Sequence, residues 1–282
     1  MKEVSIVIPA YNEEEGIEAV INDIYSEFEG TRIVFEVIVI DDGSTDQTVK
    51  KAENKARVIS HPYNLGYGAS LKKGIAAAKY EAIAIIDADG TYAAADLIKL
   101  FNRIEDGYDM VVGARKEVYH PFLILTHPAR FIFRFLCEFA LGRRIPDINS
   151  GLRVFKKSVA EKFRTTIGQG YSFTTSLTLI LFIEGYFVDY LPVSYKKRKG
   201  TSKVRFIRDS LRAGQIIIET ILRYNPIKPF ILISTFTFLV SFLFLSIYAF
   251  STDSVMGQAG FMGFYTGIIL MAIGFMSIAL KK

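Results

Sequence analysis

The segment Ala82-Ile83-Ala84-Ile85-Ile86-Asp87-Ala88-Asp89-Gly90-Thr91 decides how the rest of the sequence is interpreted. It begins with an apolar run that is short for a helix, so the run predicts a buried parallel strand. Asp87 and Asp89 follow where this strand ends, and ligands of open α/β sheets bind beyond the carboxyl ends of the strands. Two carboxylates there predict a site for a hard divalent cation. The alternative is a strand-to-turn connection in which both aspartates accept backbone hydrogen bonds.

A second apolar segment that ends in acidic residues strengthens the cation-site interpretation. Phe35–Ile40 predicts a buried strand, and Asp41-Asp42 follow it directly before Gly43. Short apolar runs alternate with helical patterns, which predicts an α/β fold with a mostly parallel sheet and helices on both faces. The expected strands cover residues 4–8, 35–40, 58–59, 82–86, 110–112 and 187–193, and the expected helices cover residues 13–28, 46–55, 69–78 and 94–105.

Local signals predict where several of these elements begin and end. Pro9 is expected to break the first strand. Asn12 is expected to cap the helix that follows, because Glu13–Glu15 would then lie in its first turn, where acidic residues favour the helix dipole. Ser44 and Gln47 resemble a capping box for the next helix.

Composition limits the class of protein. The 282 residues allow one large domain or two. A formal charge of +5 suits an anionic membrane surface or a phosphorylated substrate. The single cysteine, Cys137, excludes an internal disulfide framework and is expected to be an apolar filler. The sequence enters its first strand without a signal-peptide pattern, so we expect the first domain to remain where it is made.

Two apolar segments that contain arginines, and one basic run, point to a membrane surface and to phosphate groups. Residues 121–142 are too charged to span a bilayer, so an interfacial amphipathic helix and a core helix both remain open. Tyr195–Lys203 holds five basic residues around Gly200-Thr201-Ser202, a composition that suits a loop wrapping phosphate oxygens. Residues 206–224 predict an amphipathic helix with arginines for lipid head groups.

The C-terminal part predicts a membrane anchor. Residues 229–250 and 261–280 are long, uncharged and apolar, so each predicts a membrane-spanning helix. Lys and Arg flank the pair on one side, while the connecting loop has none, which predicts that both termini and the α/β domain are cytosolic. The expected domains are residues 1–205, an interface helix at 206–227 and a two-helix hairpin at 228–282.

Six short motifs occur along the chain in this order: Val7–Glu13, Asp41–Asp46, Asp87–Asp89, Gly113–Arg115, Asp147–Arg153 and Arg198–Lys203. Together they resemble family 2 glycosyltransferases of the GT-A fold, and within them the dolichyl- or polyprenyl-phosphate sugar synthases, of which dolichyl-phosphate mannose synthase is the best known. The resemblance covers roughly residues 3 to 205.

The resemblance implies three groups of site residues. The nucleotide-sugar donor would be bound by Pro9, Tyr11, Glu13, Ile40, Asp41, Asp42, Asp87, Ala88, Asp89, Arg198 and Lys203. The acceptor phosphate would be held by Arg115, Arg144 and Ser150, with Arg143 as a substitute for Arg144. A Mn²⁺ or Mg²⁺ ion would be held by Asp87 and Asp89, with Thr91 as third ligand. Mannose synthases often have Gln where this chain has Thr91, which leaves the third ligand and the donor open.

The implied reaction is an inverting sugar transfer from GDP-mannose or a UDP-hexose to dolichyl or polyprenyl phosphate. Catalytic roles would fall to Asp89, which holds the metal, and to Arg198, which stabilises the leaving diphosphate. Asp147 would orient groups or only shape a turn. The acceptor phosphate is already anionic near neutral pH, so no strong base is required, and the three histidines are expected to have structural or surface roles.

Three other classes of protein would require sequence features that differ from those of this chain. A processive polysaccharide synthase would need a membrane channel and usually a Gln-x-x-Arg-Trp motif, whereas this chain has no tryptophan. A catalytically silent membrane scaffold or flippase partner would not need the Asp-x-Asp motif or the basic loop. A dinucleotide-binding dehydrogenase is excluded by the lack of Gly-x-Gly-x-x-Gly after the first strand. No nucleic-acid partner is expected, while the sugar, the lipid length and a homo-oligomer remain open.

Overall fold

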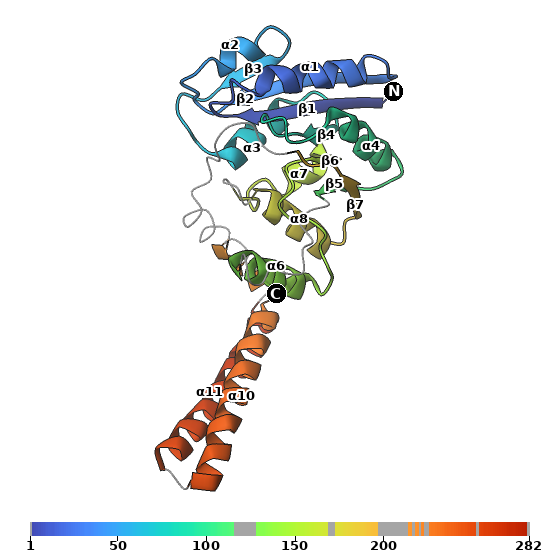
Figure 1. The fold of residues 1–282 in the computed structure, drawn as a ribbon. Coiled ribbons are helices and arrows are strands. Elements are labelled where there is room, and N and C mark those ends of the chain that lie inside the picture. Colours follow the sequence, from blue (N-terminus) through green and yellow to red (C-terminus); the bar gives the residue numbers. More distant parts are fainter. Residues whose placement is uncertain are drawn as a thin grey trace. The chain divides into compact units, whose positions relative to one another are not determined.

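The computed structural model describes residues 2–115, 128–168, 173–196, 226–251 and 254–280, together with residues 214–215, 218–219 and 221–222. It divides into two compact units, Met1–Ile217 and Ile218–Lys282. The first unit holds the sheet and the second holds two long helices (Figure 1). The predicted helix at 206–224 falls largely outside the described residues.

A mixed but mostly parallel sheet forms the centre of the first unit, as predicted. The described strands follow the order β3-β2-β1-β4-β6-β5-β7. Only β6 runs antiparallel to its described neighbours, β4 and β5, while the other neighbouring pairs are parallel. The strands are β1 (Lys2–Ala10), β2 (Ile33–Asp41), β3 (Arg57–Ser60), β4 (Ala82–Ile85), β5 (Met110–Arg115), β6 (Arg153–Lys156) and β7 (Val188–Val193).

Helices cover both faces of this sheet. The described helices of this unit are α1 (Ile17–Phe28), α2 (Thr48–Ala52), α3 (Tyr67–Ala77), α4 (Ala94–Glu105), α6 (Pro128–Leu141), α7 (Lys157–Lys162) and α8 (Phe173–Ile183), and α6 packs against α8. One face of β1, with Ile6 and Ile8, joins the buried cluster that includes apolar residues of α1 and α4. The other face carries Val7, which packs closely against Gly74 of α3. Because strand side chains alternate between faces, an uninterrupted apolar run serves both.

Pro9 does not end the first strand. Strand β1 continues through Pro9 to Ala10, and Pro9 pairs in register with Ile40. On the other side, β4 pairs with β1 only from Val4 to Val7. A proline is tolerated there because it lies beyond the end of β4, where no partner strand needs its missing N–H.

The two predicted helix caps are wrong. Helix α1 begins at Ile17, so Asn12 lies in the preceding loop with a φ of 51°. Its backbone N–H donates to Ser44 Oγ (2.9 Å), and its side-chain Oδ1 accepts from Thr45 N (2.8 Å). Helix α2 begins only at Thr48, so Ser44 does not open it. Instead of capping helices, these polar side chains form hydrogen bonds that join the loop after β1 to the loop after β2.

For residues 121–142 the sequence left open an interfacial helix and a core helix, and the described part of this segment has one exposed and one buried side. In α6, Cys137 is buried while Phe135 is exposed. Burial raises the pKa of the Cys137 thiol to about 12, which fits its expected role as an apolar filler. Residues 121–127 of the predicted segment lie outside the described residues.

The second unit is a helical hairpin of α10 (Ile227–Ser251) and α11 (Ser254–Ala279). Their mean hydropathies are 2.4 and 1.9, and both are long and apolar enough to cross a membrane. Glycines of α11 let the helices approach closely, since Gly260 meets Leu245 and Gly267 meets Phe238. The predicted second span, 261–280, begins later than α11, whose first turns already pack against α10 through Gly257 and Gly260.

Candidate active site

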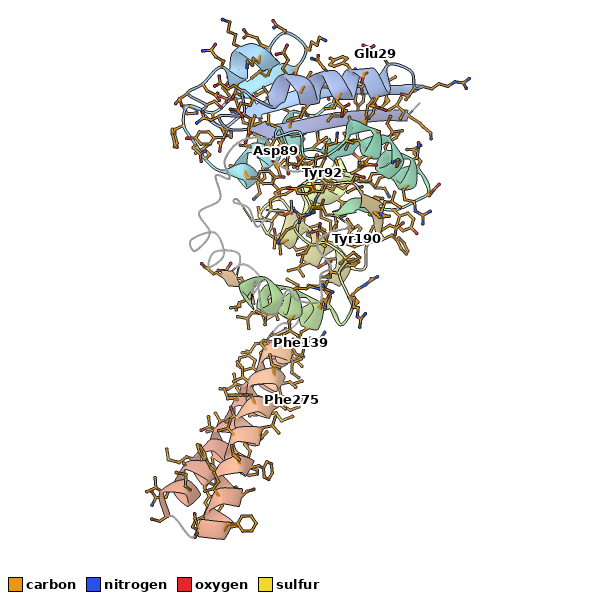
Figure 2. All side chains as sticks on the ribbon, in the orientation of Figure 1. Glu29, Asp89, Tyr92, Phe139, Tyr190 and Phe275 are labelled. Atoms are coloured by element: carbon orange, nitrogen blue, oxygen red, sulfur yellow. The ribbon has the colours of Figure 1, made fainter. Side chains whose placement is uncertain are left out.

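Asp87 and Asp89 lie directly after β4, in the connection to α4 (Figure 2, where Asp89 is labelled). Asp89 is 7% exposed, and its Oδ1 accepts hydrogen bonds from Thr91 N (3.1 Å) and Thr91 Oγ1 (2.7 Å). Thr91 is itself fully buried. In the described structure, therefore, the Thr91 hydroxyl orients the Asp89 carboxylate, which also accepts the backbone hydrogen bond of the turn given above as the alternative.

The surroundings of Asp87 hold its carboxylate closely. Its Oδ1 accepts a hydrogen bond from the Tyr67 hydroxyl of α3 (3.1 Å). On another side the carboxylate lies against the backbone of Gly151, where an added Cβ would be 2.2 Å from Asp87 Oδ2. Burial and the charge of Asp87 raise the pKa of Tyr67 well above its ordinary value. Tyr67 therefore stays protonated and continues to donate to Asp87.

The aspartate pair fits a substrate-bridging cation better than a site built wholly from protein ligands. Among the described residues, no group of three His, Cys, Asp or Glu side chains could hold a metal ion. Mg²⁺ commonly takes one or two carboxylates and completes its shell with substrate phosphates and water. The hard oxygen donors of Asp87 and Asp89 match this arrangement.

The predicted nucleotide-pocket residues gather at the carboxyl ends of β1 and β2. Pro9 and Ile40 are partners in the sheet, and Ala10 pairs with Asp41. Tyr11 and Glu13 follow on the loop after β1, where Glu13 N donates to Thr48 Oγ1 (2.8 Å). Ala88 is buried, and its carbonyl oxygen lies so close to Gly16 that a Cβ there would be 2.5 Å away.

Asp42 is tied into the fold by its side chain. Its carboxylate accepts from His61 Nδ1 (2.9 Å), Leu65 N (2.9 Å) and Gly66 N (2.8 Å). Asp41 is also buried and accepts from Ser44 N (3.1 Å). Both aspartates thus fix the loops that surround the end of β2. His61 has the structural role expected for it. It follows β3, the strand that pairs with β2, and therefore lies beside Asp42 at the end of β2.

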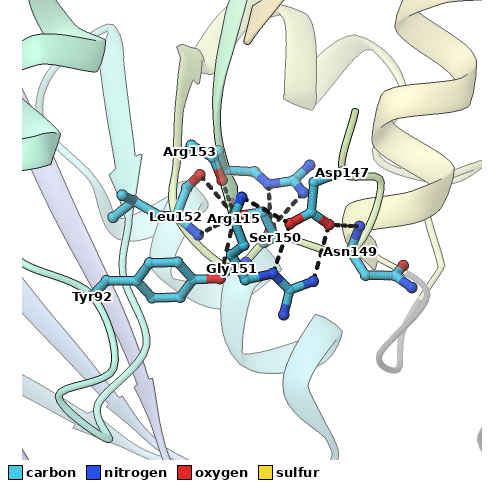
Figure 3. Close-up of polar contacts among 9 residues, drawn as sticks. Tyr92, Arg115, Asp147, Asn149, Ser150, Gly151, Leu152 and Arg153 are labelled. Carbon is cyan, nitrogen blue, oxygen red and sulfur yellow. Dashed lines mark hydrogen bonds and ion pairs between the residues drawn. The ribbon is translucent and has the colours of Figure 1, made fainter. Parts of the chain in front are cut away.

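Arg115 and Asp147 form a bidentate ion pair (Figure 3). Arg115 Nε lies 2.6 Å from Asp147 Oδ2, and Nη2 lies 2.9 Å from Oδ1. The guanidinium also lies over the Tyr195 ring, 5.2 Å from its centroid. Burial lowers the pKa of Arg115, but the hydrogen bonds and charge of Asp147 outweigh this effect and raise it. Arg115 is therefore a fixed, permanently charged cation.

Ser150 belongs to the same loop but is fully buried. Its hydroxyl donates to Gly113 O (2.6 Å), and the hydroxyl of Tyr92 lies 3.3 Å away (Figure 3). In the described structure Ser150 therefore positions its loop, and the phosphate contact expected from the resemblance stays a prediction.

Arg153, in β6, anchors this loop from behind. It is fully buried, and its Nε and Nη2 donate to Ser150 O at 3.1 and 2.6 Å, while Nη1 donates to Thr174 O at 3.0 Å. Burial lowers its pKa from the ordinary value, although neighbouring tyrosines and Asp147 oppose this. The sequence assigned no role to Tyr67, Tyr92 or Arg153. For Arg153 a signal was available, because it ends the Asp147–Arg153 motif.

The remaining predicted cations differ in their placement. Arg144 is exposed in the turn after α6, and the guanidinium of the neighbouring Arg143 lies 4.3 Å from the centre of the Phe182 ring. Arg198 and Lys203 lie outside the described residues. The structure thus brings Arg115, Asp147 and Ser150 together and does not test the basic loop.

Comparisons with known proteins agree on the family. The model for glycosyl transferase family 2 matches residues 5–164. A dolichyl-phosphate hexose transferase of Haloferax volcanii is 26% identical over 221 residues, 78% of this chain and 94% of that protein. A polyprenol monophosphomannose synthase of Mycolicibacterium smegmatis is 28% identical over 222 residues, 71% of this chain and 80% of that protein.

A solved structure supports the fold. Glucosyl-3-phosphoglycerate synthase of Mycobacterium tuberculosis, crystallised with Mn²⁺, UDP-glucose and phosphoglyceric acid, superposes with a TM-score of 0.63 at 20% identity, covering 78% of this chain and 80% of that one. At this identity, the similarity shows the fold alone.

Proposed function

The chain belongs to glycosyl transferase family 2 and is a glycosyltransferase, and from that premise we propose that it transfers a sugar from a nucleotide sugar to a polyprenyl or dolichyl phosphate. The observation that carries this proposal is the position of the Asp87–Asp89 carboxylates beside the loop that holds the Arg115 cation. In this loop, the backbone of Gly151 packs against Asp87, and the Asp147 carboxylate binds Arg115. One loop thus contacts both the carboxylates that would hold the donor's cation and the arginine that would hold the acceptor phosphate.

The names of similar proteins support the choice of acceptor. The Haloferax protein is named dolichyl-phosphate hexose transferase, and the Mycolicibacterium protein is named polyprenol monophosphomannose synthase. A human relative, 28% identical over 250 residues, is named dolichyl-phosphate beta-glucosyltransferase. Both mannosyl and glucosyl transfer occur among these names, so GDP-mannose and UDP-hexoses both remain donors to test.

In the proposed mechanism, bound Mn²⁺ or Mg²⁺ would neutralise charge on the leaving diphosphate. Asp87 and Asp89 would hold the ion, Thr91 would orient Asp89, and Arg198 and Lys203 would add positive charge. Arg115 would hold the acceptor phosphate with the help of Arg144, and Asp147 would fix the direction of Arg115. The phosphate oxygen attacks without a protein base, with inversion at the anomeric carbon, because it is already anionic and needs chiefly to be positioned.

We propose that the hairpin holds this site at the membrane. Apolar side chains such as Leu239, Phe250 and Phe275 are exposed on α10 and α11, which suits contact with lipid. The basic residues flanking the hairpin favour a cytosolic catalytic unit and cytosolic termini.

The test compares Asp89→Asn with Asp189→Asn, which changes a carboxylate that binds Arg103 at the β7 edge. Purified full-length protein is supplied with a labelled nucleotide sugar, polyprenyl phosphate and Mn²⁺. We expect wild type and Asp189→Asn to label the lipid and Asp89→Asn to lose transfer by about 100-fold or more, the scale of losing a group that stabilises transition-state charge. Full transfer by Asp89→Asn would refute the metal assignment. Metal-independent nucleotide binding without transfer would favour the silent scaffold instead.

A further inference from the structure

The Tyr92 side chain joins the two halves of the proposed site. Tyr92 lies in the connection after Asp87–Asp89 and is buried. Its hydroxyl oxygen lies 3.2 Å from Gly151 N and 3.3 Å from Ser150 Oγ (Figure 3). One phenol group therefore reaches from the acidic connection to the loop that carries Asp147.

The direction of each hydrogen bond follows from the number of available hydrogens. Ser150 has one hydroxyl hydrogen, and we assign it to Gly113 O at 2.6 Å because the other carbonyl acceptor, Leu152 O, is 3.4 Å away. In its contact with Tyr92, Ser150 must then be the acceptor, so the Tyr92 hydroxyl donates to it. Gly151 N in turn donates to the Tyr92 oxygen. The three groups form a chain that is complete only when residue 92 both donates and accepts.

These hydrogen bonds hold the loop of residues 147–153, which contacts both Asp87 and Arg115. Gly151 is held where its backbone meets the Asp87 carboxylate. Earlier in the same loop, Asp147 holds the Arg115 guanidinium. The loop can therefore transmit a displacement at one contact to the other.

The Tyr92 ring provides a second connection between the same groups. It packs edge-on against Tyr195, with 5.1 Å between ring centroids, and Arg115 lies over that same Tyr195 ring. Next to Tyr195, Lys196 N donates to Thr91 O (2.8 Å). The ring and the hydroxyl of Tyr92 thus reach Arg115 by separate routes.

We propose that Tyr92 is a positioning residue that sets the Asp87 carboxylate and the Arg115 guanidinium relative to each other. This inference rests on the proposed function for its effect on turnover. Its effect on the loop is independent of that function. A tyrosine that only filled the core would be replaced by phenylalanine without consequence, because the ring and its packing would remain.

The experiment compares Tyr92→Phe with Tyr108→Phe in the full chain. The control variant also loses one tyrosine hydroxyl. The Tyr108 hydroxyl accepts a hydrogen bond from Arg103 Nη2 (2.9 Å), and both residues are distant in sequence from residues 147–153. Hydrogen–deuterium exchange is measured without metal or substrate on peptides covering residues 147–153. Mn²⁺ affinity is measured with UDP present, and kcat and KM are measured with the active donor.

For Tyr92→Phe we expect exchange in 147–153 to become about tenfold faster, since a buried donor and acceptor lose a partner. We expect Mn²⁺ affinity to fall several-fold and kcat to fall about tenfold, because misplaced reacting groups slow the transition state more than they weaken binding. Tyr108→Phe should match wild type. Ser150→Ala combined with Tyr92→Phe should lose no more kcat than the worse single variant, because the two hydroxyls act as one unit.

Unchanged exchange and unchanged kcat in Tyr92→Phe would overturn the proposal, as would a lower melting temperature without change in either. If wild type transfers no sugar to polyprenyl phosphate while exchange and Mn²⁺ affinity respond as described, the proposed acceptor is wrong and the coupling role of Tyr92 stands.

Discussion

Replacing Gly151 by alanine should displace the Asp87 carboxylate. The added Cβ would lie 2.2, 2.6 and 2.7 Å from Asp87 Oδ2, Cγ and Oδ1. Ordinary carbon–oxygen contacts are about 3.3 Å or longer, so the carboxylate or the loop must move by about 1 Å. The loop resists movement, because Arg153 holds Ser150 O on one side and Tyr92 holds Gly151 N on the other.

A displacement of about 1 Å at a reacting centre can cost roughly 100-fold in rate. We therefore expect Gly151→Ala to lower kcat for sugar transfer by about 100-fold and to weaken Mn²⁺ binding in the presence of UDP. Overpacking should also lower the free energy of unfolding by about 1–3 kcal/mol, which leaves the protein folded at 25 °C.

The assay measures transfer of labelled sugar to lipid, together with Mn²⁺ titration and urea denaturation. Gly30→Ala is the matched control, because a Cβ there meets nothing within 4 Å. If Gly151→Ala keeps wild-type kcat and wild-type Mn²⁺ affinity, then Asp87 does not need the position that the structure gives it, and its role as a ligand is refuted.

Three further predictions concern the acceptor side, the core and the cysteine. Asp147→Asn should raise the KM for the lipid phosphate about tenfold and leave the donor KM unchanged, because the amide no longer pairs both Arg115 nitrogens; an unchanged acceptor KM would contradict this. Gly74→Ala should lower the free energy of unfolding by about 1–3 kcal/mol in urea denaturation, because its Cβ would lie 2.3 Å from Val7 Cγ1; equal stability would show that α3 moves freely. Cys137, with a pKa of about 12 against an ordinary 9.0, should resist iodoacetamide at pH 8 in the folded protein and react once the protein is unfolded. Folding favours the neutral thiol, so the contribution of Cys137 to the free energy of unfolding should fall as the pH rises above 9. Rapid alkylation of the folded protein would contradict the burial of Cys137.

The alternation of apolar runs with helical patterns, and the aspartates that follow two of these runs, were sufficient to predict the α/β class and the mostly parallel sheet. The antiparallel β6 was not predicted, because Arg153–Lys156 is short and its first residue is charged. Strand direction depends on pairing with β4 and β5, which are distant in sequence, and no local pattern encodes it.

The sequence allows candidate site residues to be named where a residue type carries its own chemistry. Asp87, Asp89 and Arg115 stand at strand ends, where ligands of such sheets bind. Tyr92 and Arg153 could not be assigned, because their roles depend on the atoms of Ser150 and Gly151 that they meet in the fold. Asn12 was assigned wrongly for the same reason, since its partners Ser44 and Thr45 come from another loop.

A donor screen tests the central claim most directly. Full-length protein in vesicles that contain polyprenyl phosphate is incubated with Mn²⁺ and each labelled nucleotide sugar in turn, and label in the lipid fraction is counted with and without EDTA. We predict that one GDP- or UDP-sugar labels the lipid and that EDTA abolishes the signal. No labelled lipid with any donor, or labelling that is indifferent to EDTA, would contradict the proposed reaction at Asp87 and Asp89.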